Sequence, residues 1–117
     1  MLRATEINEK NGETFGLFLH FGERGHGSIR NRRTLATLPG LRTDGLVIDA
    51  AGRLYVAAGP GEHVFSPQGQ RLGTIPFPRS PQNMAFAGPD KKTLYVVGGG
   101  AVYAVAMQAE GPKGRAR

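Results

Sequence analysis

A repeat of 40 residues constrains the fold of this chain more than any other feature of its sequence. The tripeptide LYV at 54–56 recurs at 94–96, and Gly59 recurs as Gly99 at the same offset. A repeat of ~40 residues that carries four short strands is typical of a β-propeller blade. The 117 residues therefore hold two to two and a half blades, fewer than the roughly four that a closed ring needs.

From Thr43 onward, apolar residues recur with a period of two, and turn-forming residues separate the apolar runs. This pattern predicts short antiparallel strands, at 46–49, 54–58, 62–65, 70–77, 83–86, 94–97 and 101–107. No helix is expected, because 18 Gly and 8 Pro would interrupt one repeatedly. We expect an all-β fold of about two four-stranded blades, a partial propeller that completes or covers itself by oligomerisation.

The first third of the chain is less regular. Strands are expected at 4–8 and 15–21, an open loop at 22–28, and the outer strand of a preceding blade at 29–38. The predicted organisation is an irregular N-terminal segment with one or two strands (1–28), propeller-like blades (29–107) and a basic flexible tail (108–117).

Composition excludes several classes of protein. The chain has no Cys, which excludes disulfide scaffolds, thiolate catalysis and cysteine-based zinc sites. The longest apolar run, 101–107, is far shorter than the ~18 residues of a membrane span, so no membrane interaction is expected. The first residues lack the apolar core of a signal peptide, and a cytoplasmic location is the default expectation.

The chain is basic, with 15 Lys and Arg against nine acids and a net charge of +6. A basic balance raises the question of nucleic acid. The basic residues are dispersed, however, apart from small clusters at 30–33 and 113–117, and no aromatic residues alternate with them as a stacking surface would need. A basic nucleic-acid-binding β protein is therefore the weaker alternative.

Three stretches, in order along the chain, carry a family resemblance: TDGLVIDAAGRLYVA (43–57), VFSPQGQRLGTIPFP (64–78) and NMAFAGPDKKTLYV (83–96). They resemble the closing blades of the regucalcin/gluconolactonase/luciferin-regenerating-enzyme family, whose members are six-bladed propellers. The resemblance extends over about residues 29–107. Two positions depart from the family pattern: Thr43 replaces a Pro, and Ala87 stands where Gly is usual.

The resemblance implies a metal-dependent lactone hydrolase acting on a small sugar lactone. In that family one divalent cation, such as calcium or zinc, lies at the mouth of the central channel, held by carboxylate and amide groups from different blades. The motif match assigns one ligand to Asp44, which is also the candidate catalytic proton acceptor. Asn83 matches a family Asn and is a candidate for the pocket rim. The other family ligands come from earlier blades, and no stretch here matches them.

Each candidate also has a structural interpretation. Asp44-Gly45 is a common turn pair, Asn83 can stabilise its own blade, and Asp49 is expected to be a turn residue at a strand end. Glu62 and His63 are expected to be a half-exposed pair. Gly98–Gly100 is expected to be a tight strand connection, since no helix follows it to form a phosphate site.

Three functional hypotheses remain. The chain is a gluconolactonase-like hydrolase or a truncated relative of one, a non-catalytic interaction or assembly module derived from a propeller, or the weaker nucleic-acid binder. A two-blade unit leaves open sheet edges, so a homo-oligomer is expected. One form is a trimer of two-blade chains, in which three Asp44 carboxylates converge on one cation.

Overall fold

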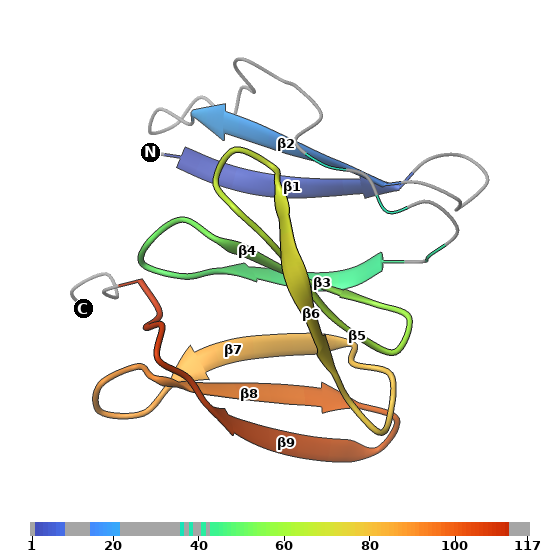
Figure 1. The fold of residues 1–117 in the computed structure, drawn as a ribbon, viewed down its shortest axis with the longest axis vertical. Coiled ribbons are helices and arrows are strands. Elements are labelled where there is room, and N and C mark those ends of the chain that lie inside the picture. Colours follow the sequence, from blue (N-terminus) through green and yellow to red (C-terminus); the bar gives the residue numbers. More distant parts are fainter. Residues whose placement is uncertain are drawn as a thin grey trace. The chain divides into compact units, whose positions relative to one another are not determined.

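The computed structural model describes residues 2–8, 15–21, 36, 38, 41 and 43–112. These residues form nine strands and no helix (Figure 1). The chain divides into two compact units, residues 1–42 and 43–117. None of the described segments is a helix long and apolar enough to cross a bilayer.

The first unit contains an antiparallel hairpin. Its strands are β1 (Leu2–Asn8) and β2 (Phe15–Phe21), paired from Leu2 opposite Phe21 to Asn8 opposite Phe15. Both strands were expected from the sequence. The predicted loop at 22–28 and the predicted strand at 29–38 lie outside the described residues, apart from positions 36 and 38, which are not in a strand.

The second unit begins with a four-stranded antiparallel meander. Its strands are β3 (Thr43–Ile48), β4 (Leu54–Ala58), β5 (Gly61–Phe65) and β6 (Arg71–Pro76), adjacent in that order. All four agree with the predicted strands to within a few residues. The turn after β3 needs Gly52, which has a φ of 87°, a conformation that glycine adopts without steric cost.

A three-stranded meander follows, made of β7 (Asn83–Ala87), β8 (Thr93–Gly98) and β9 (Ala101–Ala106). Gly99 and Gly100, with φ of 57° and 78°, form the two-residue loop between β8 and β9. Two consecutive positive φ values are those of a type I′ hairpin turn, which confirms the predicted tight connection.

The repeat seen in the sequence is a repeat of structure. The LYV tripeptides lie in β4 and β8, the second strand of each sheet. The all-β, blade-like architecture is therefore as expected. The two blades differ in one respect, because the β3–β6 sheet has four strands and the described part of the β7–β9 sheet has three.

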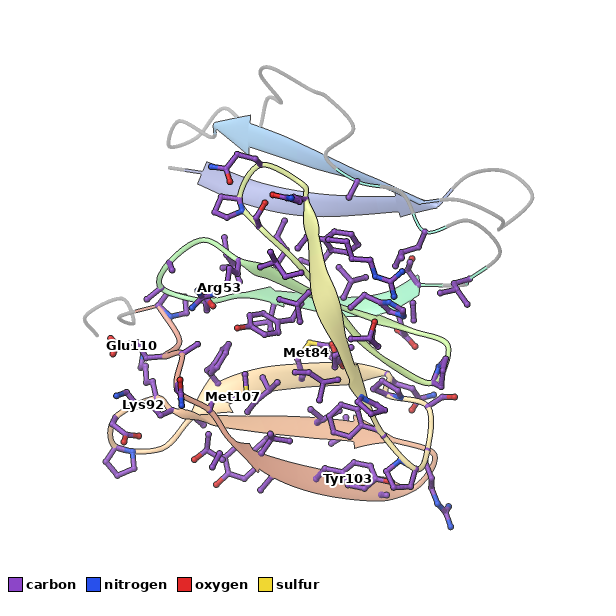
Figure 2. The ribbon with its side chains drawn as sticks, in the orientation of Figure 1. Arg53, Met84, Lys92, Tyr103, Met107 and Glu110 are labelled. Carbon is purple, nitrogen blue, oxygen red and sulfur yellow. The ribbon has the colours of Figure 1, made fainter. Side chains whose placement is uncertain are left out.

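The core of the second unit lies between these two sheets. Ala57 from β4 packs with Met84, Leu94 and Val96 from the β7–β9 sheet, and Figure 2 shows Met84 between the two layers. Partly buried apolar residues surround this cluster: Val47, Phe77, Phe86, Tyr103, Val105 and Met107. Two aromatic contacts connect this region, Tyr55 with Phe86 at 5.5 Å between ring centroids and Phe77 with Tyr103 at 5.3 Å.

The segment after β9 is held against the second unit. The Met107 amide donates to the Lys92 carbonyl, and the Gly111 amide donates to the Lys91 carbonyl, each at 2.8 Å. The Glu110 carbonyl accepts from the Ala50 amide at 2.8 Å. The segment predicted as a tail therefore starts with residues that join the turns of both sheets.

We expect Leu94→Ala to lower the free energy of unfolding by about 2–5 kcal/mol, because it leaves a cavity in a packed core. Leu94 is 0% exposed. The matched control is Leu72→Ala, the same chemical change at a side chain that is 53% exposed, where the loss should be within about 0.5 kcal/mol. Urea denaturation of the three proteins measures both values, and equal losses would contradict the assigned core.

Candidate functional site

Asp44 lies in a β-bulge at the start of β3. Thr43 pairs with Ala58 and Leu46 pairs with Val56, so two residues, Asp44 and Gly45, stand opposite Ala57 alone. An extra residue bends a strand and redirects its side chains, and bulges are frequent beside active sites. Asp44 is exposed, so its carboxylate is available to a ligand.

Gly45 lets β7 approach this bulge closely. Its amide donates to the Gln82 carbonyl at 2.8 Å. A Cβ at position 45 would lie 2.3 Å from Asn83 Oδ1 and 2.9 Å from the Gln82 carbonyl oxygen. The starts of β3 and β7 are therefore neighbours, and a residue with a side chain at position 45 would not fit between them.

Asn83 is therefore close to Asp44, although 39 positions separate them in the sequence. The Met84 amide donates to Asn83 Oδ1 at 2.9 Å, which orients the side chain. Its –NH₂ is the part that can donate to a substrate oxygen. The structure thus places the two sequence-predicted site residues at the starts of β3 and β7, the first strands of two different sheets, which contact each other at Gly45.

The donors at this end suit a hard cation but form only part of a site. A carboxylate and an amide offer oxygen ligands of the kind that Ca²⁺ takes, about 6–8 of them in a complete shell. Within residues 43–112 and the other described positions, no three His, Cys, Asp or Glu residues group together as metal ligands.

Asp49 has the structural role expected of it. Its carboxylate accepts hydrogen bonds from the Ala51 amide (2.9 Å), the Arg53 amide (3.0 Å), Arg53 Nε (2.7 Å) and the Tyr55 hydroxyl (2.8 Å). Burial opposes ionisation, but these hydrogen bonds outweigh it and hold the pKa of Asp49 below its usual value. The turn between β3 and β4 is thereby fixed.

The expectation of a half-exposed Glu62–His63 pair is wrong, because both residues are buried, at 0% and 4% exposure. Glu62 pairs with Ala57 and Ile75 across the sheet, so it shares the face of Ala57, which packs on the β7–β9 sheet. Neither carboxyl oxygen of Glu62 has a hydrogen-bond partner among the described residues. Burial raises the pKa of Glu62 to about 8.

His63 points to the opposite face of β5 and is held in a polar cluster. Nε2 lies 3.0 Å from the Ala58 carbonyl oxygen, and because a carbonyl can only accept, Nε2 carries the proton. Nδ1 then accepts from Arg71 Nη2 at 3.1 Å. Burial, together with the nearby Arg71 charge, lowers the pKa of His63 despite the bond to Ala58.

A groove of about 450 Å³ lies elsewhere on the second unit. It is lined by Arg53, Tyr55, Val64, Leu72, Gly73, Thr74, Ile75, Met107, Gln108 and Ala109. Neither Asp44 nor Asn83 lines it. Two of its polar lining groups, Arg53 Nε and the Tyr55 hydroxyl, donate hydrogen bonds to Asp49.

Two meanders of the same repeat, packed face to face, define a partial β-propeller. The sequence matches the model of the SMP-30/Gluconolactonase/LRE-like region over residues 22–99, and the chain belongs to this family. The family resemblance expected from the three stretches is confirmed.

Individual relatives agree with this assignment. The lactonohydrolase oryH of Aspergillus oryzae is 31% identical over 84 residues, which are 72% of this chain and 18% of that protein. A solved gluconolactonase from Xanthomonas campestris is 26% identical with a TM-score of 0.67, covering 82% of this chain and 34% of that one. A luciferin-regenerating enzyme shares the fold, at 24% identity and a TM-score of 0.69, covering 89% and 45%. The chain thus spans less than half of each.

We expect Gly45→Ala to lower the free energy of unfolding by about 1–3 kcal/mol, the usual cost of overpacking. The added methyl would have to displace both the Asn83 side chain and the Gln82 backbone. Gly73→Ala is the matched control, because nothing lies within 4 Å of a Cβ at that position. If thermal denaturation shows equal losses for the two variants, the close approach of β3 and β7 is wrong.

We expect stability to fall as the pH rises from about 4.5 towards 8, with Glu62 contributing about 1.4 kcal/mol per pH unit. The pKa of Glu62 is raised on folding from 4.5 to about 8, so in this window the folded chain holds a proton that the unfolded chain has released. The contribution is greatest below pH 4.5 and is lost through pH 8.

The measurement is the difference in unfolding free energy between the wild type and Glu62→Gln across this pH range. Glutamine keeps the shape and does not titrate, so its curve should lack this slope. Glu110→Gln, at a less buried position, should retain it. Parallel curves for the wild type and Glu62→Gln would refute a buried protonated carboxyl.

Proposed function

We propose that this chain forms part of the active site of a metal-dependent lactone hydrolase. The observation that carries the proposal is the placement of Asp44 in an exposed bulge beside the start of β7. Membership of the gluconolactonase-like family supports it, as does the similarity to a named lactonohydrolase. Since the chain spans only part of its relatives, the remaining cation ligands would come from other blades.

Asp44 would hold the cation through its carboxylate, and Asn83 would orient the substrate from the rim. A bound divalent cation would polarise the lactone carbonyl and lower the pKa of water. The Asp44 carboxylate can also accept a proton from an attacking water in the role of general base. The Asn83 –NH₂ can donate to an oxygen of the substrate. The contact at Gly45 holds the start of β3 beside the residues that begin β7.

The second candidate function is a non-catalytic assembly module. One observation favours it: the described residues contain no group of three metal-ligating side chains. Under this hypothesis, the blade surfaces bind other polypeptides, and Asp44 is a turn residue of β3. The two candidates differ in whether the chain binds a divalent cation.

We expect Asp44→Asn to weaken divalent-cation binding by about tenfold or more, because affinity depends on the number of charged ligands. Isothermal titration with Ca²⁺ and Zn²⁺ measures this, and hydrolysis of a sugar δ-lactone is assayed in parallel. Asp90→Asn is the matched control, since Asp90 is also exposed but caps the β7–β8 turn through the Lys92 amide. Equal binding by the wild type and Asp44→Asn, or none by either, would favour the assembly module.

A further inference from the structure

Glu62 is a titratable side chain that the proposed function does not use. It is 0% exposed, and its cross-strand neighbour Ala57 belongs to the cluster that joins the two sheets. Neither carboxyl oxygen has a hydrogen-bond partner among the described residues. The offset of 40 makes Val102 its counterpart in the β7–β9 sheet, so the repeat does not require an acid here. Positions where a sequence breaks the packing rules in this way are expected to have a functional role.

No charged group faces Glu62 from the opposing sheet. The strands β7, β8 and β9 contain no charged residue. Among the side chains packed around the core cluster, only Tyr103 titrates, and a phenol cannot neutralise a carboxylate. An ionised Glu62 would therefore be a buried charge without a counter-ion, which is strongly unfavourable.

The sheet that contains Glu62 offers no counter-ion on this face either. The hydroxyl of Tyr55, on β4, already donates to the carboxylate of the β3–β4 turn. Arg71, at the start of β6, is bonded to His63, which points to the opposite face of β5. The one charged residue of β3 is Asp44, an exposed acid. Ionisation of Glu62 therefore requires that its carboxylate reach water.

Glu62 lies in the same cross-strand row as the contact between β3 and β7. Ala57 lies between them, opposite Glu62 on one side and opposite the bulge that contains Gly45 on the other. Ala57 also packs with Met84, the second residue of β7. The Gly45 amide donates to the Gln82 carbonyl at the same place. A change in packing at Glu62 therefore acts directly on the contact between β3 and β7.

The other end of the two sheets is held by separate bonds. The Ala50 amide, in the turn after β3, donates to the Glu110 carbonyl, and the Gly111 amide donates to the Lys91 carbonyl in the β7–β8 turn. Figure 2 shows Lys92 and Glu110 at this end, so their charges do not meet Glu62. The sheets can loosen at the row of Glu62 while this end stays joined.

We propose that Glu62 is a proton-controlled switch, in which the two sheets pack at its row while the carboxyl is neutral and separate there when it ionises. In the neutral state, the contact at Gly45 keeps Asn83 near Asp44, so the candidate site is assembled. Ionisation sends the carboxylate to water, loosens the packing between the sheets and breaks the hydrogen bond of the Gly45 amide. Protonation of a buried group is an established way to bias an element with two states.

The direction of the switch follows from the two pKa values of Glu62. Its pKa is about 8 while the sheets are packed, against 4.5 for the same group in water. Between these values the open state has released a proton that the packed state still holds. Opening therefore becomes about tenfold more favourable with each pH unit in this window. The packed state is most favoured below pH 4.5, and the effect is complete above pH 8.

Amide hydrogen exchange of Gly45, followed by NMR, measures this opening. We expect its protection, relative to an unstructured peptide at the same pH, to fall about tenfold per pH unit between 4.5 and 8 in the wild type. In Glu62→Gln, which has the same shape and stays neutral, the protection should not change with pH. Glu62→Val, which has the side chain of the counterpart residue, is the second variant and should behave in the same way. Glu110→Gln is the matched control and should retain the wild-type dependence.

Urea distinguishes a local opening from unfolding of the whole unit. A local opening exposes little surface, so low urea should leave the exchange of Gly45 unchanged. The Met107 amide, bonded within the β7–β9 side at the other end, should exchange faster as urea is added. Circular dichroism at each pH confirms that the variants are folded.

Equal pH dependence of Gly45 exchange in the wild type and in the two Glu62 variants overturns the proposal. Acceleration of Gly45 exchange by urea as steep as that of Met107 also overturns it, since Glu62 would then act only on the stability of the whole unit. No bound cation is needed for these measurements. The switch can therefore fail while Asp44 binds a cation, and it can hold while Asp44 binds none.

Discussion

The apolar contact between the two sheets is the interaction on which the second unit depends. Ala57 meets Met84, Leu94 and Val96 there, and three of these four side chains are wholly buried. The period of two along β4 and β8 places these residues on facing surfaces, and the aromatic contact between Tyr55 and Phe86 adds to the same layer. Burial of apolar surface of this kind is the main favourable term in folding. Because the contact sets how β3 lies beside β7, it also positions the candidate site.

Glu62 is a polar exception within this layer. A buried carboxyl without hydrogen bonds is costly when ionised, and such a group usually becomes neutral by a shift of its pKa. The raised pKa of Glu62 shows this response to burial. Asp49 shows the opposite outcome, since four hydrogen bonds and the Arg53 charge keep it ionised. The same chemical group therefore has two states in one small unit, according to the partners that each position provides.

Most of the strands could be predicted from the sequence because their signals are local. Alternating apolar residues and glycine-containing turns predict β4, β7 and β9 within a residue or two, and the recurrence of LYV reveals that the two sheets are repeats. The burial of Glu62 could not be predicted in this way. Glu62 lies on the same face of β5 as Val64, two residues along, and this spacing was a sign that Glu62 faces the interior. Only the packing of the β7–β9 sheet against that face makes it buried. Because Glu62 is next to the polar His63, the sequence predicted a half-exposed pair at this position.

The same distinction between local signals and long-range contacts applies to the candidate site. The sequence by itself determined that the chain is all-β and repetitive and that it belongs with the gluconolactonase-like proteins, because motifs and periodicity are properties of neighbouring positions. Asp44 and Asn83 are candidate site residues that the motif match predicts. Only the tertiary structure decided that Asp44 lies in a bulge, that Gly45 admits β7 to its side, and that Asn83 is therefore a neighbour. These features depend on contacts between strands far apart in the chain, and such contacts form only when the sheets pack.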